Sequence, residues 1–190
     1  MRRFAALGAT VMLVLCATLA EPTASLSRLA DTTEYQVKAA FIYNFVKFVQ
    51  WPADAFLEKA GASISLCILG RDELGDALEG LNGKSAQGRI FSVRRIDRPG
   101  EADRCQVLYL CRSERERMRA ILKGIKAGVL TIGDMKSFAS AGGIINFILT
   151  QKKVSFEINV EAAEKAGLKI SSQLLKLAKI VKEGDGREER

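Results

Sequence analysis

Residues 37–52 read VKAAFIYNFVKFVQWP and hold the densest group of aromatic side chains in the chain. Seven of the thirteen Phe, Tyr and Trp residues lie between Tyr35 and Phe56. Apolar residues recur at three- and four-residue spacing, which predicts a helix, and further apolar positions widen its buried face beyond the usual stripe. Pro52 ends this helix. We predict a helix buried on more than one side, which is either a central core helix or, in part, a docking site for a partner.

The residues before this helix are typical of an export signal. Two arginines precede an apolar run over residues 4–19, and Thr18-Leu-Ala20 has the small-residue pattern of a signal peptidase site. The run is shorter than the roughly 20 apolar residues of a membrane-spanning helix, so a retained anchor is the weaker alternative. We predict a signal peptide over residues 1–20, a flexible segment over 21–33 and a mature protein outside the cytoplasm.

Length and charge indicate one domain without a nucleic-acid surface. Removal of the predicted signal leaves 27 basic and 22 acidic residues, and a net charge of +5. Acidic and basic side chains alternate, so no block of one sign marks a surface for nucleic acid. The remaining residues, about 170, are enough for a single core. We predict one α/β domain over residues 34–182 and a disordered tail over 183–190.

Predicted strands and helices alternate after the aromatic helix. Short apolar runs predict strands at 64–69, 89–96, 106–111 and 129–133. A helix over 72–81 and a second one, which begins at a capping box formed by Ser113 and Glu116 and ends at Gly128, separate them. This alternation is typical of a sheet with right-handed parallel crossovers.

The C-terminal third departs from that alternation. Strands at 144–149 and 154–160 are only four residues apart, which is too close for a parallel crossover and predicts an antiparallel hairpin. A short helix over 161–166 follows, and a last helix begins at Ser171 or Ser172 and extends through Val181. The predicted fold class is therefore α/β, with a mixed, mainly parallel sheet, flanking helices and a C-terminal antiparallel β-hairpin followed by helices.

Three cysteines lie outside the predicted signal peptide. In an oxidising compartment two of them should pair. A strand over 106–111 spans roughly 20 Å, whereas a disulfide needs Cα atoms within about 7 Å, so Cys105 cannot pair with Cys111. Cys67 pairs with one of these two, and we favour Cys105 because it lies at the entrance of the strand. Cys111 then keeps its thiol, which we interpret as a small buried hydrophobe.

The sequence offers no recognisable catalytic chemistry. It has no histidine, the commonest general base and metal ligand, and no Cys-x-x-Cys pair. Gly83-Lys-Ser85 resembles the end of a phosphate-binding loop, but Leu78 stands where that motif needs glycine. The carboxylates of Asp134, Glu157 and Glu164 have no spacing that would bring them together. We expect no catalytic residue, no metal site and no cofactor, and conclude that the protein is not an enzyme.

Several blocks, in order from Val37 to Val181, closely resemble the YfiR-like proteins. They are the aromatic stretch 37–52, Leu66-Cys-Ile-Leu-Gly70, Thr131-Ile-Gly-Asp134, Gly142-Gly-Ile-Ile-Asn-Phe147, Phe156-Glu-Ile-Asn159 and Ser171-Ser-Gln-Leu-Leu-Lys-Leu-Ala178. The resemblance implies a non-enzymatic periplasmic protein that binds and represses the periplasmic sensor domain of an inner-membrane diguanylate cyclase, which would control cyclic-di-GMP signalling and biofilm formation. It also implies an outer-membrane peptidoglycan-binding lipoprotein as a second partner. A homodimer is a further candidate assembly, and nucleic acid is not an expected partner.

The resemblance also bears on the cysteines. Cys67 and Cys105 match the long-range pair of the family, but no cysteine lies between Ser140 and Phe147, where some members carry a second bridge. A switch between two disulfides is therefore not expected. A buried Cys111 would not supply the thiolate that disulfide exchange needs, so we expect the Cys67–Cys105 bridge to be structural.

The outer face of the C-terminal hairpin is the candidate partner surface. It mixes apolar and polar side chains as interface cores do, and its expected members are Ile144, Ile148, Glu157, Asn159 and Leu168. The alternative is that a helix covers this face, as happens in many α/β sheets. A competing function is that of a periplasmic small-ligand sensor, in which Tyr43 and Trp51 line a pocket. A redox enzyme that uses Cys111 is a third possibility.

Overall fold

The computed structural model describes residues 23–56, 63–71, 73–151 and 153–184. The chain divides into two units, residues 1–33 and 34–190. In the first unit the described residues belong to the start of α1 (Thr23–Phe48), which begins inside the segment predicted to be flexible. The predicted signal peptide and the last six residues of the predicted tail lie outside the described residues. None of the described helices has the length and hydropathy needed to cross a membrane.

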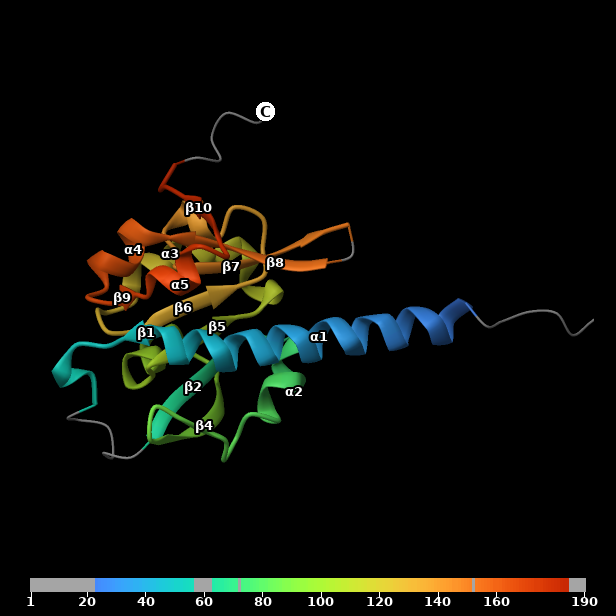
Figure 1. Cartoon of the computed structure of the whole chain (residues 1–190), viewed down its shortest axis with the longest axis horizontal. Helices are drawn as coiled ribbons and strands as arrows, with labels where there is room; N and C mark the ends of the chain where they lie inside the picture. The colour runs from blue at the N-terminus through green and yellow to red at the C-terminus, as the bar shows by residue number, and fades with distance from the viewer. Residues whose placement is uncertain (1–22, 57–62, 72, 152, 185–190) are drawn as a thin grey trace, which may run out of the picture. The chain divides into compact units, whose positions relative to one another are not determined.

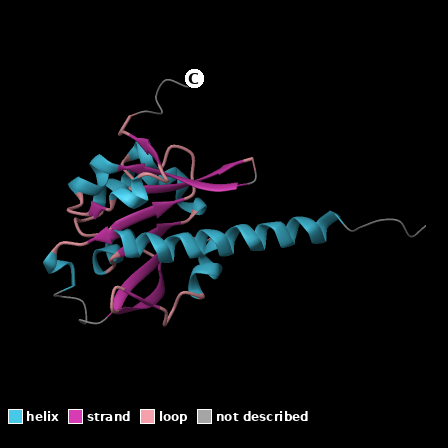
Figure 2. Cartoon of the chain, viewed as in Figure 1, coloured by secondary structure: helices cyan, strands magenta, loops and turns pink. Residues whose placement is uncertain are grey.

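The second unit is built on an eight-stranded sheet (Figures 1 and 2). Its strand order is β10-β8-β7-β6-β5-β2-β4-β3. The bounds are β2 Ser63–Leu69, β3 Ser85–Ala86, β4 Arg89–Ile96, β5 Val107–Leu110, β6 Leu130–Gly133, β7 Ile145–Thr150, β8 Lys153–Asn159 and β10 Lys179–Val181. Strands β4, β2, β5, β6 and β7 are mutually parallel. Because β2 lies between β4 and β5, this is a doubly wound arrangement. The predicted α/β class with a mixed, mainly parallel sheet is confirmed.

Three antiparallel or edge elements complete the sheet. Strand β8 pairs antiparallel with β7, as the short connection predicted, β3 pairs antiparallel with β4, and β10 adds parallel to β8. A separate two-stranded sheet joins β1 (Val49–Gln50) to β9 (Lys169–Ile170). The aromatic helix therefore ends at Phe48, where the chain turns into β1, and not at Pro52 as predicted.

Helix α1 supplies much of the larger core. Ile42, Phe45 and Val46 are fully buried, together with residues of β2, β5, β6 and the β7–β8 hairpin. The Phe45 ring lies 5.7 Å from Phe147 and 4.8 Å from Phe156, measured between ring centroids. Burial of a phenylalanine stabilises the fold by up to about 3 kcal/mol, so these contacts hold the hairpin base on α1. The prediction of a core helix is confirmed for this part of α1.

The opposite face of the sheet carries a second core under η2 (Pro99–Arg104) and α3 (Met118–Gly124). Cys67 of β2 and Cys105, two residues before β5, form a disulfide there with Cα atoms 5.9 Å apart. This is the favoured pairing of the sequence analysis. Cys111 lies outside the disulfide, and its side chain is buried in the larger core.

The last predicted helix begins at Ser172, as expected, but its predicted extent through Val181 is wrong. Helix α5 covers only Ser172–Leu175, and residues 179–181 form strand β10 in its place. Lys179 pairs with Glu157 and Val181 with Asn159 on the outer edge of β8. That edge would otherwise leave backbone donors and acceptors without a strand partner. The pairing outweighs the helical spacing of the apolar residues, which is a weak local preference.

The predicted capping box at Ser113 is also wrong. The hydroxyl oxygen of Ser113 accepts a hydrogen bond of 2.8 Å from the backbone N–H of Arg71, across the end of β2. The chain there forms the 3-10 helix η3 (Arg112–Arg117), and α3 begins only at Met118. Two shorter helices, α2 (Glu73–Glu79) and α4 (Val160–Lys165), lie close to their predicted positions.

Two glycines make room for one buried ring. Phe138 is fully buried, and Gly133 at the end of β6 and Gly143 before β7 both lie against its ring. A Cβ atom on Gly143 would approach a ring carbon to 2.2 Å, which is far inside van der Waals contact. Because these two positions carry no side chain, the segment between β6 and β7 can pack closely around the ring of its own residue Phe138.

Candidate functional site

The outer half of the β7–β8 hairpin is a two-stranded ribbon. Pairing between the two strands runs from Ile145↔Ile158 to Thr150↔Lys153. In β7 only the first two residues, Ile145 and Asn146, pair with β6. In β8 only the last three residues, 157–159, pair with β10. Among the described strands, residues 147–150 and 153–156 therefore pair only with each other. Figure 1 shows the ribbon reaching past the neighbouring strands.

The ribbon presents apolar side chains to solvent. Leu149 is 54% exposed, and its cross-strand neighbour Val154 is half-buried. On the other face of the ribbon Ile148 is half-buried and pairs with Ser155. An apolar ribbon with open backbone edges is a typical site for protein association.

A buried lysine links α1 to the end of β6. The side chain of Lys38 is 1% exposed, and its ammonium group pairs with Glu34 and, at 2.5 Å, with the Asp134 carboxylate. A buried charge is stable only when it is paired in this way. The same ammonium lies 5.9 Å from the centroid of the Phe147 ring.

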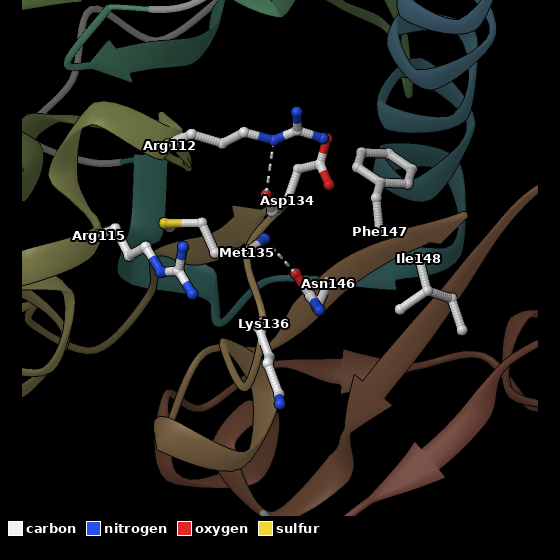
Figure 3. Close-up of a pocket in the computed structure, with 8 residues that line it drawn as sticks. All are labelled: Arg112, Arg115, Asp134, Met135, Lys136, Asn146, Phe147 and Ile148. Atoms are coloured by element: carbon white, nitrogen blue, oxygen red, sulfur yellow. Dashed lines mark hydrogen bonds and ion pairs between the residues drawn. The ribbon is translucent and has the colours of Figure 1, made fainter. Parts of the chain in front are cut away.

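Asp134 has a second cationic partner in Arg112. A guanidinium nitrogen of Arg112 lies 2.7 Å from the Asp134 carboxylate, and its Nε donates to the Asp134 carbonyl at 3.1 Å (Figure 3). Burial lowers the pKa of Arg112, but the charge and hydrogen bond of Asp134 raise it, so that the net pKa lies above the ordinary value. The four groups Glu34, Lys38, Asp134 and Arg112 carry no net charge together.

A pocket of about 430 Å³ opens beside this network (Figure 3). Its walls come from the segments that follow β5 and β6 and from the first half of β7. The lining residues are Arg112, Arg115, Asp134, Met135, Lys136, Asn146, Phe147 and Ile148. Arg115 and Lys136 are exposed, whereas Met135 is buried in the core under η2 and α3 and Phe147 in the larger core on the opposite face of the sheet. The pocket thus combines an apolar surface with cationic side chains.

One amide ties the pocket to the hairpin. The backbone N–H of Met135 donates to the side-chain oxygen of Asn146 at 3.1 Å, and the Asn146 amide nitrogen lies 3.4 Å from the Glu157 carboxylate. Glu157 in turn pairs with Lys179 of β10 at 3.3 Å. The segment after β6 is therefore held in place by side chains of β7, β8 and β10.

Comparison with known proteins identifies the family. The YfiR/HmsC-like family matches residues 35–179, which is most of the chain. The chain belongs to the YfiR/HmsC-like family. Proteins of this family are known as regulatory rather than catalytic proteins.

Two solved structures resemble the chain in fold. One is a "conserved domain protein" from Vibrio cholerae O1 biovar El Tor strain N16961, with 12% identity and a TM-score of 0.53, which covers 78% of this chain and 60% of that one. The other is the ABC domain in complex with L-Trp from Streptococcus pneumonia, with 10% identity and a TM-score of 0.45, over 62% of this chain and 55% of that one. The YfiR/HmsC-like chain thus spans about three fifths or less of each, and at these identities the likeness concerns the fold alone.

Three of the five residues expected at the partner surface of this YfiR/HmsC-like protein are buried in its core. Ile144 and Leu168 pack in the larger hydrophobic cluster. Asn159 is fully buried and caps α4, because its side-chain oxygen accepts from the Ala162 N–H at 2.9 Å and its amide donates to the Ala139 carbonyl at 2.8 Å. Their placement on an outer face is therefore wrong: Ile144 and Leu168 belong to the core, and the segment between β6 and β7 contacts Asn159 through Ala139.

Ile148 and Glu157 remain accessible. Both lie on the same face of the hairpin, Ile148 in the ribbon and Glu157 at its base. The exposed fraction of the Glu157 side chain is 15%, and part of its carboxylate is already engaged by Lys179 and Asn146. A partner would meet Ile148 and the neighbouring ribbon before it met Glu157.

Tyr43 and Trp51, the aromatic pair expected in a ligand sensor, do not line the pocket beside Asp134. The Tyr43 hydroxyl donates to the Ser85 carbonyl at 2.7 Å, whereas Trp51 Nε1 donates to the Gln106 carbonyl at 3.3 Å. Trp51 also packs edge-on against Phe56. Both rings have structural contacts of their own.

Sequence reasoning missed that charged side chains gather at this pocket. Arg112 follows β5, and Asp134 and Lys136 follow β6, so these three charged residues stand at the carboxyl ends of adjacent parallel strands. Side chains at these ends gather at one edge of a doubly wound sheet, where such folds bind ligands. The predicted strands at 106–111 and 129–133 contained this signal.

Proposed function

We propose that this YfiR/HmsC-like protein is a non-enzymatic periplasmic regulator that binds the periplasmic sensor domain of an inner-membrane diguanylate cyclase and holds the cyclase inactive. Cyclic-di-GMP output and biofilm formation then rise when the complex dissociates. The family match over residues 35–179 carries this proposal. The disulfide supports the location, because such bonds persist in oxidising compartments.

Repression of this kind requires binding and no chemistry. The regulator must bind the inactive conformation of the sensor domain more tightly than the active one, because only a difference in affinity shifts an equilibrium. A shift from mostly active to mostly inactive cyclase needs a difference of about 5.5 kcal/mol between the two conformations. A rigid surface with a few well-packed apolar side chains is the simplest source of such a difference.

The hairpin supplies a surface of this type. We define the ribbon surface as both faces of the ribbon and its base, with Leu149 and Val154 on one face and Ile148 and Glu157 on the other. It combines exposed and half-buried apolar side chains with one carboxylate, and the backbone edges beside it have no strand neighbour among the described residues. A sensor domain can bind such a surface through its own apolar side chains, by adding a strand to the open edge, or both.

Calorimetric titration against the sensor domain tests the proposal. The protein is titrated with the periplasmic domain of the diguanylate cyclase encoded nearest its gene, first unchanged and then as Ile148→Ala and Leu149→Ala. Each substitution should weaken binding by at least about tenfold, as expected for residues near the centre of an interface, and leave the melting temperature within a few degrees. Ile90→Ala is the matched control, because Ile90 is an equally exposed residue (54%) on β4, near the opposite end of the sheet.

The control decides between a specific surface and a general effect. Loss of affinity in Ile90→Ala, or unchanged affinity in both ribbon variants, would refute the ribbon surface. Absence of binding by the unchanged protein would refute the cyclase as partner. A peptidoglycan-binding outer-membrane lipoprotein is the second proposed partner, and it should compete with the sensor domain in the same titration. Sedimentation of the protein alone tests the proposed homodimer.

A further inference from the structure

The pocket beside Asp134 lies where doubly wound sheets bind ligands. It opens at the carboxyl ends of β5 and β6, next to the switch point between β2 and β5, where the order in which strands are added to the sheet reverses. Crevices at this end of the strands are the usual ligand sites of such sheets. A volume of about 430 Å³ falls within the range of small-molecule pockets.

The charges around the pocket do not cancel. Glu34 and Asp134 are balanced by Lys38 and Arg112. Arg115 and Lys136 also line the pocket, and no ion pair is found for either within the described ranges.

Nearby carboxylates do not change this balance. Glu114 pairs with Arg117, Glu157 pairs with Lys179, and neither glutamate lines the pocket. Glu116 is exposed next to Arg115 in the sequence, but it does not line the pocket either. The lining therefore carries two positive charges in excess, and these favour an anion.

The apolar side chains of the lining indicate that the ligand has an apolar part as well as a negative charge. Met135 is buried, and Ile148, whose side chain lies on the face of β7 opposite to Phe147, is half-buried. A small inorganic anion would leave these two apolar side chains in contact with water, whereas a neutral apolar molecule would leave the cations unused. An anion with an apolar body satisfies both. Arginine binds carboxylates in a bidentate geometry, which makes a carboxylate the best match for the charged end.

We propose that this pocket binds a small organic carboxylate. Its apolar body lies against Met135 and Ile148, and its carboxylate is held by Arg115 and Lys136. Arg112 contributes positive potential while it stays paired with Asp134. The proposal does not depend on a cyclase partner, since it follows from the pocket alone.

Phenylacetate is a suitable probe, because it joins one carboxylate to one aromatic ring. The protein expressed from the complete sequence is titrated with phenylacetate, with acetate, which has the charge without the ring, and with 2-phenylethanol, which has the ring without the charge. Binding is followed by the backbone amide signals in nitrogen–proton correlation spectra. We expect saturable binding of phenylacetate, at least about tenfold tighter than that of either comparison compound, with the largest shifts at Met135, Lys136 and residues 146–148.

A charge-matched pair of variants separates the pocket from the general surface. The double substitution Arg115→Gln and Lys136→Gln should weaken phenylacetate binding by at least about tenfold. Arg104→Gln with Lys169→Gln removes one arginine and one lysine, both exposed, from outside the pocket and should leave binding unchanged. The proposal is overturned if phenylacetate does not saturate, if acetate binds equally well, if the shifts lie elsewhere, or if the two double variants lose affinity equally.

Discussion

Removal of the Cys67–Cys105 disulfide should destabilise the protein mainly through its unfolded state. The bridge joins residues 38 positions apart, and closure of a loop of this length stabilises the fold by about 4 kcal/mol at 25 °C on the chain-entropy estimate. Each buried sulfur also contributes packing, for which about 1 kcal/mol is a reasonable figure. The variant Cys67→Ala, Cys105→Ala should therefore lose about 6 kcal/mol of unfolding free energy.

Urea unfolding of the oxidised protein and its variants measures this loss. Cys111→Ala is the control, because Cys111 is equally buried but closes no loop, so its destabilisation reports the packing contribution of one sulfur. Twice the loss in the control, subtracted from the loss in the double variant, leaves the loop contribution of about 4 kcal/mol. For a protein of this size that contribution corresponds to a fall of about 8–16 °C in the melting temperature. A loop contribution below about 1 kcal/mol would refute the reasoning.

Three further substitutions test other parts of the structure by the same unfolding assay. Lys38→Met leaves Glu34 and Asp134 close together without their shared cation and should cost about 3 kcal/mol, whereas Lys47→Met, at an exposed position on the same helix, should cost less than about 0.5 kcal/mol. Gly143→Ala should cost at least about 2 kcal/mol, because the added methyl group overlaps a buried ring; a neutral result would show that the ring moves freely. Asn159→Ala removes a helix cap and should cost about 2 kcal/mol; weaker sensor-domain binding by a variant of normal stability would contradict its structural role.

The sequence was sufficient where the local pattern and the tertiary environment agree. Strand β4 has its predicted bounds, residues 89–96, and the antiparallel hairpin follows from a connection too short for any other topology. The last helix failed because residues 179–181 fit a helical stripe equally well, and only the open edge of β8 decides that they form a strand. The spacing of apolar residues along the sequence contains no information about whether a strand edge elsewhere in the fold is open.

The site was less predictable than the fold because its contacts join distant parts of the chain. Asp134 was noted as an isolated carboxylate, but its partner Lys38 is 96 residues away and was assigned to an apolar helix. Ile144 and Asn159 were placed on the outer face of the hairpin, and Leu168 beside it, because this surface mixes apolar and polar side chains. Such a mixture does not say whether another segment covers the surface.

The depth of the disulfide determines when it can form. Both of its cysteines are fully buried under η2, and thiol–disulfide exchange requires direct approach of a thiolate to one of the sulfur atoms. An oxidase can reach these sulfurs only while the strands are still apart, and a reductant can reach them only after the fold opens. The oxidation state of the two cysteines is therefore set by the redox conditions during folding. It does not change when the surroundings later become reducing, as long as the protein stays folded.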